Sequence, residues 1–148
     1  MISRDDQVLD MFRELPSHRG CPAAELDAVE TALGVVLPLR YRELMELDAE
    51  RLCGAGIFAP LRHLNELRLH ASQLLIEDGH AFRLERADVV FGWDDNYAFY
   101  FFKADATDDP AVKMFNYYDS SHGWKPVMAF DTVTTYVAAA LRRYLKLG

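Results

Sequence analysis

Four consecutive residues, Asp119, Ser120, Ser121 and His122, contain the three side-chain types of a serine-hydrolase triad. In such a triad a histidine removes the proton of the serine hydroxyl, and an aspartate orients the histidine. Neighbours in sequence rarely reach that geometry, and no nucleophile-elbow pattern surrounds these residues. We therefore expect a polar turn here, and a hydrolase that uses Asp119 and His122 is kept as an alternative.

The spacing of the histidines and carboxylates argues against other catalytic chemistry. His63 and His70 are two helical turns apart, but no third ligand follows at a spacing typical of zinc sites. General acid–base chemistry needs a buried carboxylate, whereas the adjacent pairs Asp94-Asp95 and Asp108-Asp109 are expected to diverge into solvent. The sequence therefore predicts no catalytic residue, no metal and no cofactor.

Tryptophan and tyrosine residues gather beside acidic residues near the expected strand ends. Core and edge packing accounts for most such side chains, but the same combination is typical of protein-binding hot spots. We predict a partner-binding surface in which two further acids steer the partner, and its members are Trp93, Asp94, Asp95, Asn96, Tyr118, Asp119, His122 and Trp124, with Asp108 and Asp109 as the steering pair.

The formal net charge of −7 is concentrated in one part of the 148-residue chain. Residues 77–131 hold 11 acidic and 5 basic side chains, whereas the rest of the chain is nearly balanced. Phosphate binding needs lysine and arginine, so nucleic acid is an unsuitable partner, whereas a basic protein would be attracted. The same acids also serve solubility, and that interpretation stays open.

Further features of the sequence indicate the compartment. No apolar run approaches the roughly 20 residues that cross a bilayer, and the charged N-terminus does not resemble a secretory signal. Cys21 and Cys53 have no metal-ligand spacing and are interpreted as free thiols in a reducing environment. We expect a cytoplasmic protein without membrane contact.

Residues 89–103 are the densest stretch of large apolar side chains, and the other elements are expected to pack around them. Two β-branched and aromatic runs flank residues 94–96, which predicts a hairpin. In the second run, Phe99 and Phe101 alternate with Tyr100 and Phe102, so both faces are apolar. This pattern indicates a central strand that is covered on both sides.

Capping residues and apolar spacing predict the remaining elements. Helices are expected from Ser3 to Pro16, from residue 22 to 33, from 38 to 47, from 61 to near 79, and from 131 or 132 to the C-terminal end. Residues 112–118 and 124–128 are predicted strands, 57–59 a short edge strand, and 80–87 an ambiguous segment.

This order of elements predicts an α+β fold in one domain covering residues 1–148. A mainly antiparallel sheet of about four to six strands would pack against N-terminal helices and a C-terminal helix. Residues 1–16 would form an extra helix, and residues 22–147 the core.

Four segments of the sequence follow one another in a characteristic order and spacing. Residues 25–44 contain an acidic and apolar helix, then Leu33-Gly34, then Leu37-Pro38 before a second helix. Residues 90–100 contain a strand with a glycine, an acidic turn and a next strand, residues 112–118 a further strand, and residues 129–137 a capped closing helix. In this order and spacing, the segments resemble the SUKH superfamily of Smi/Knr-type domains.

The resemblance implies a non-enzymatic protein-binding module. Many bacterial members are immunity proteins that neutralise a cognate toxin, often a nuclease, and others are intracellular regulatory or scaffold modules. We expect an immunity protein that binds a basic toxin domain through an acidic, aromatic surface. A regulatory or scaffold module with no toxin partner remains the alternative, and the sequence does not indicate an oligomeric state.

Overall fold

The computed structural model describes residues 3–94, 97–118, 120–121 and 123–146 of the chain. In chain order its elements are α1 (Arg4–Glu14), α2 (Ala23–Leu33), α3 (Leu39–Gly54), the 3-10 helix η1 (Leu61–His63), α4 (Leu64–Glu77), β1 (Asp88–Asp94), β2 (Ala98–Lys103), β3 (Val112–Asn116), β4 (Val127–Phe130) and α5 (Val133–Tyr144). Helices precede the sheet and one helix follows it, so the predicted α+β class is confirmed.

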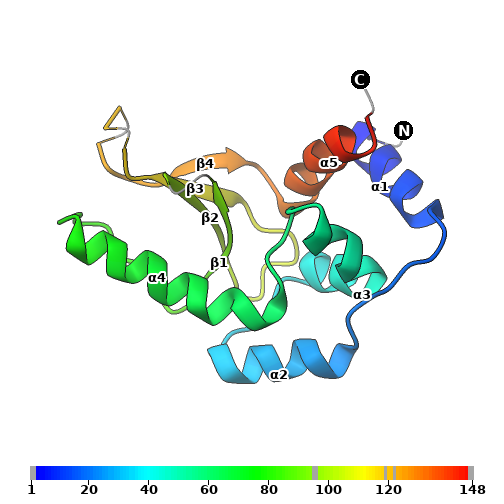
Figure 1. Cartoon of the computed structure of the whole chain (residues 1–148), viewed down its shortest axis with the longest axis horizontal. Helices are drawn as coiled ribbons and strands as arrows, with labels where there is room; N and C mark the ends of the chain where they lie inside the picture. Colours follow the sequence, from blue (N-terminus) through cyan, green and yellow to red (C-terminus); the bar gives the residue numbers. More distant parts are fainter. Residues whose placement is uncertain (1–2, 95–96, 119, 122, 147–148) are drawn as a thin grey trace.

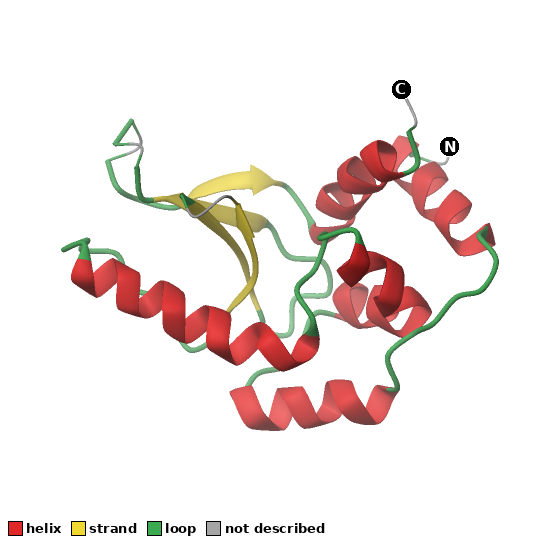
Figure 2. Cartoon of the chain, in the orientation of Figure 1, coloured by secondary structure: helices red, strands yellow, loops and turns green. Residues whose placement is uncertain are grey.

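The four strands form one antiparallel sheet in the order β1-β2-β3-β4. Helix α4 lies along one face of this sheet, whereas α3 and α5 lie on the other side (Figure 1). Figure 2 shows the same layers, with loops gathered at both ends of the strands. The sheet therefore has two covered faces and two ends at which connections meet.

The central strand β2 packs on both faces, as its alternating apolar residues predict. Phe99 and Phe101 join the core beneath α4, whereas Phe102 joins the core beneath α3 and α5. Burying each large side chain of this kind contributes about 1.5–3 kcal/mol. The two cores hold the strands in register, so the loops at the strand ends start from fixed positions.

Local capping signals set the helix ends that were predicted from sequence. The Ser3 hydroxyl accepts a hydrogen bond from the amide of Asp6 at 3.1 Å, and the Thr132 hydroxyl accepts one from the amide of Thr135 at 3.0 Å. Both bonds satisfy amide groups that have no partner inside the helix. Gly34 ends α2 in the left-handed region at φ 69°.

The extra N-terminal helix α1 packs against α5, so both chain ends lie at the same corner (Figure 1). The Asp5 carboxylate accepts hydrogen bonds from the Thr135 hydroxyl at 3.0 Å and from Arg142 at 3.3 Å. Val8, Leu9 and Phe12 are buried beneath α1. Helix α1 therefore contributes apolar side chains to the same core as α3 and α5.

A β-bulge in β1 changes the direction of the side chains that follow it. The register passes from Val90 opposite Phe101 to Gly92 opposite Tyr100, which leaves Phe91 as the extra residue. After the bulge, Trp93 is paired with Phe99 on the α4 face. Asp94 consequently points to the opposite face of the sheet.

Three short segments differ from their predicted form. The strand predicted at residues 124–128 is β4, Val127–Phe130, so Trp124 lies in the connection before it. Residues 57–59 are not a strand of the sheet, although the Ala59 amide donates to the Phe91 carbonyl at 2.8 Å and covers part of the β1 edge. Residues 82–84 are also irregular, and Phe82 packs on the α4-side core. The latter two segments fill space beside the sheet, and apolar alternation alone does not separate that role from strand pairing.

Helix α3 continues to Gly54, past the predicted end near residue 47, and it is interrupted at Asp48. The backbone of Asp48 has φ −159° and ψ 70°, outside the helical region, and its side chain is 1% exposed. A buried carboxylate requires partners. These come from His18, Arg19 and Arg51, which tie the loop after α1 to this kink.

Candidate functional site

The topology divides the predicted partner-binding residues between the two ends of the sheet. Trp93 and Asp94 end β1, and Tyr118 and Trp124 lie in the connection between β3 and β4, at the same end. The Tyr117 amide donates to the Tyr97 carbonyl at 3.1 Å, which joins the two connections. Four predicted members lie outside the described residues: Asp95, Asn96, Asp119 and His122.

Trp93 is held in place by contacts on the α4 face. Its indole Nε1 donates a hydrogen bond to the Tyr117 hydroxyl at 2.9 Å. The His70 ring, on α4, lies 4.9 Å from it between ring centroids, and Phe99 lies 5.5 Å away. The indole therefore connects β1, α4 and the residue after β3, so it fixes the end of the sheet.

Asp94 is engaged in an internal network on the opposite face from Trp93. Its carboxylate accepts hydrogen bonds from the hydroxyls of Tyr97 at 3.1 Å and Tyr100 at 3.5 Å. Burial raises the pKa of Tyr100, and the nearby negative charge of Asp94 raises it further. Because of these bonds, Asp94 has a structural role in the described structure, and reversing its charge would disturb the fold.

Asp108 and Asp109 lie in the connection between β2 and β3, at the other end of the sheet. Asp108 is exposed, and its backbone carbonyl accepts a hydrogen bond from the Arg40 amide at 3.0 Å. The Asp109 carboxylate accepts the Thr134 amide at 3.0 Å and the Thr134 hydroxyl. Asp109 thus caps the first turn of α5, and it does not belong with the aromatic residues in space.

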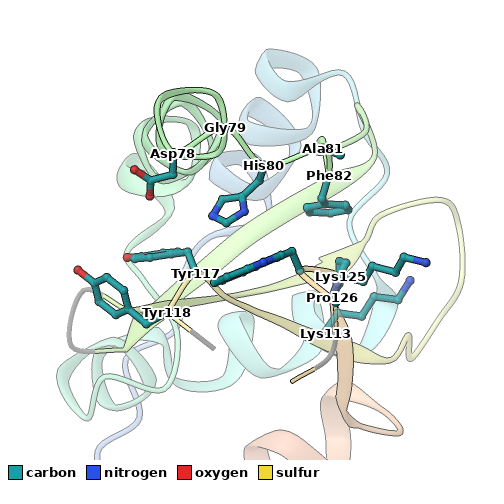
Figure 3. A pocket seen from close by; sticks show the side chains of 12 residues that line it. Asp78, Gly79, His80, Ala81, Phe82, Lys113, Tyr117, Tyr118, Lys125 and Pro126 are labelled. Atoms are coloured by element: carbon teal, nitrogen blue, oxygen red, sulfur yellow. The ribbon is translucent and has the colours of Figure 1, made fainter. Parts of the chain in front are cut away.

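A groove lies at the end of the sheet that carries the aromatic residues, with a cavity volume of about 1180 Å³. It is lined by Asp78, Gly79, His80, Ala81, Phe82, Lys113, Tyr117, Tyr118, Gly123, Trp124, Lys125 and Pro126 (Figure 3). These residues come from the segment after α4, from β3 and from the β3–β4 connection. The groove therefore forms where α4 and its following segment stop covering the sheet.

His80 organises the wall of this groove, and it was not singled out from the sequence. Its ring lies 5.2 Å from Phe115 and 4.9 Å from Trp124, measured between centroids. Its Nε2 is buried and has no hydrogen-bond partner among the described residues. The sequence around it, residues 80–87, gave an ambiguous pattern, so no local signal connected His80 with Trp124.

Positively and negatively charged side chains lie at opposite ends of the groove. Figure 3 shows Lys113 and Lys125 pointing the same way at one end, and Asp78 and Tyr118 at the other. Both lysines are exposed, and within the described part of the chain neither forms an ion pair. The groove itself is therefore not acidic, although the chain has a net charge of −7.

Among the described residues, no group of three or more potential metal ligands is present. Both cysteines are free, and burial, followed by the hydrogen bond to Glu25, raises the pKa of Cys21 to about 12. A thiol of this kind is a poor nucleophile, because the thiolate is the reactive form.

The fold and the groove define an α+β protein with a partly exposed aromatic site at one end of its sheet. Comparisons with protein-family models, with curated proteins and with solved structures gave no match. The resemblance to the SUKH superfamily therefore stays a prediction. No helix among the described residues is long and apolar enough to cross a membrane.

Proposed function

We propose that this chain is a non-enzymatic protein-binding module that contacts its partner at the aromatic end of the sheet. The observation that supports this most strongly is the pair of exposed aromatic residues on a rigid base. Tyr118 is 75% exposed and Trp124 is 37% exposed, and both line the groove. Exposed tryptophan and tyrosine side chains on a fixed framework are typical of binding hot spots.

The rigid framework favours binding because it lowers the side-chain conformational entropy that is lost when a partner binds. Trp124 packs on His80, His80 packs on Phe115, and Trp93 donates to the Tyr117 hydroxyl. A side chain that is already ordered loses little rotamer freedom when a partner covers it, whereas a mobile side chain loses about 0.5–1.5 kcal/mol. Trp124 is therefore the residue that we expect to contribute most.

In its sharper form, the proposal is a cytoplasmic immunity protein that neutralises a basic toxin domain. The net charge of −7 supports long-range attraction between such a partner and this chain. The proposed contact set is narrower than the set predicted from sequence. It keeps Trp93, Tyr118 and Trp124, and it leaves out Asp109, whose carboxylate is bonded to α5. The alternative is a regulatory or scaffold module.

The test is capture of partners from an extract of the native cells, at low and at high salt, with the bound proteins identified. The wild-type protein is compared with a Tyr118→Ala, Trp124→Ala variant. A Tyr144→Ala variant is the matched control, because Tyr144 is 47% exposed but lies on α5. The proposal expects one basic protein that the wild type and the control retain and the groove variant loses. Equal capture by all three proteins would contradict it.

A further inference from the structure

We propose that the groove and the outer edge of β4 bind an extended, acidic segment of the protein partner. The segment would add to the sheet beside β4 and place a carboxylate near Lys113 and Lys125, with an apolar side chain beside Trp124. This inference rests on the proposed function: the partner is basic as a whole and is attracted by the net charge of −7, whereas the one segment that enters the groove is acidic, because Lys113 and Lys125 line the groove.

The two edges of the sheet differ in how they are covered. At the β1 edge, the Ala59 amide donates to the Phe91 carbonyl at 2.8 Å. At the outer edge of β4, on the side away from β3, no backbone hydrogen bond from a described loop or helix residue reaches Val127–Phe130. An open edge presents unpaired amide and carbonyl groups, which is the arrangement that accepts an added strand.

The open edge of β4 and the groove are continuous. Pro126 lines the groove and directly precedes β4. Lys113 is paired with Met128 across the β3–β4 ladder, so their side chains lie on the same face of the sheet. Lys113 also lines the groove, and Met128 is 61% exposed. A strand beside β4 would therefore pass next to groove residues.

The end of the groove beside β4 carries positive charge. In a chain with a net charge of −7, the two lysines at this end of the groove have no ion-pair partner within the described residues. Like charges close together favour the arrival of a carboxylate. Successive side chains of a strand alternate between faces, so a carboxylate and an apolar side chain two residues apart would both face the groove.

The size of the site favours a peptide segment over a small molecule. The cavity volume of about 1180 Å³ is above the usual 300–1,000 Å³ of small-molecule pockets. Strand β4 has 4 residues, which gives a pairing length of roughly 13 Å at 3.3 Å per residue. A segment paired along β4 would cover Met128, and its continuation past Pro126 would run toward Trp124.

The test uses a random dodecapeptide library displayed on phage and selected against the purified protein, residues 1–148. Selected peptides are then measured against a Lys113→Glu, Lys125→Glu variant. A variant with Arg62→Glu and Arg143→Glu is the matched control, because it has the same net charge and both of these arginines are exposed on other elements. Wild-type-like urea denaturation of both variants establishes that they are folded.

We expect enrichment of peptides with an acidic residue two positions from an aromatic or aliphatic one. These peptides should bind the lysine variant about tenfold or more weakly, and the control as well as the wild type. Amide chemical shifts should change in β4 when a peptide is added. Failure to enrich acidic peptides, equal binding to the lysine variant, or unchanged β4 amides would overturn the inference. If the Tyr118→Ala, Trp124→Ala variant nevertheless loses capture of the native partner, the proposed function is still supported.

Discussion

Replacing Asp48 with asparagine should destabilise the protein strongly, although Asp48 is far from the proposed binding site. The carboxylate is 1% exposed and accepts four hydrogen bonds. Two come from backbone amides, of Arg51 at 3.2 Å and Arg19 at 3.4 Å, and two from side chains, of Arg51 and His18, both at 2.9 Å. Asparagine keeps the shape but removes the charge that these donors face.

The expected loss follows from the cost of leaving charged donors unpaired in a buried place. Breaking a buried ion pair costs about 3–5 kcal/mol, but the His18 and Arg51 side chains are 21% and 25% exposed, so water replaces part of the interaction. We therefore expect the free energy of unfolding to fall by about 3 kcal/mol. In a protein of this size, that corresponds to a decrease in Tm of about 6–12 °C.

The same substitution should change how stability depends on pH. Burial by itself raises the pKa of the Asp48 carboxyl, but the bonds from Arg51, Arg19 and His18 hold it below the ordinary value of 3.8. A carboxyl with a lowered pKa stabilises the folded state above the ordinary value, and that stabilisation is lost as pH falls through the folded value. The difference between wild type and variant should therefore shrink from pH 7 to about pH 3.

Urea denaturation at both pH values measures these effects. Asp10→Asn is the matched control, because the Asp10–Arg13 pair is a surface pair, 53% and 45% exposed, and its loss should cost less than about 0.5 kcal/mol. A loss below about 1 kcal/mol for Asp48→Asn at pH 7, or a difference that does not change with pH, would refute the reasoning.

Three further substitutions test other contacts. Tyr41→Phe should raise the free energy of unfolding by about 1 kcal/mol, because the Tyr41 hydroxyl is buried and has no hydrogen-bond partner among the described residues; thermal denaturation measures this, and a decrease would contradict it. Tyr117→Phe should lower the free energy of unfolding by about 1 kcal/mol, because Trp93 Nε1 loses its hydrogen-bond acceptor. An unchanged midpoint of urea denaturation would contradict this expectation. Asp109→Ala should cost about 1 kcal/mol through loss of the α5 cap without weakening partner capture, and weakened capture at unchanged stability would instead favour the steering role.

The parts of the fold that depend on residues close together in the sequence could be predicted. Ser3 and Thr132 cap helices through bonds within four residues, and the alternation in β2 shows directly that both its faces are apolar. The kink at Asp48 was not predictable, because it depends on His18 and Arg19, which lie about 30 residues away in the chain. A single sequence contains no periodic signal for such a contact.

The candidate site was predictable only in part, for a related reason. Trp93 and Trp124 stood out by residue type, but the bulge at Phe91 decides which face of the sheet Trp93 and Asp94 each point to. One extra residue reverses the alternation of a strand, and the sequence does not mark where it is inserted. His80 was missed because its role comes from its contact with Trp124, which lies far from it in the sequence.

The central claim is that a protein partner binds at the aromatic end of the sheet, and its most direct test is one dissociation constant. Isothermal titration calorimetry with the captured partner compares the wild type with Trp124→Ala. The account predicts about 30-fold weaker binding, equivalent to about 2 kcal/mol, with a loss in folding stability of about 1 kcal/mol or less. A dissociation constant within about twofold of the wild-type value would contradict the claim.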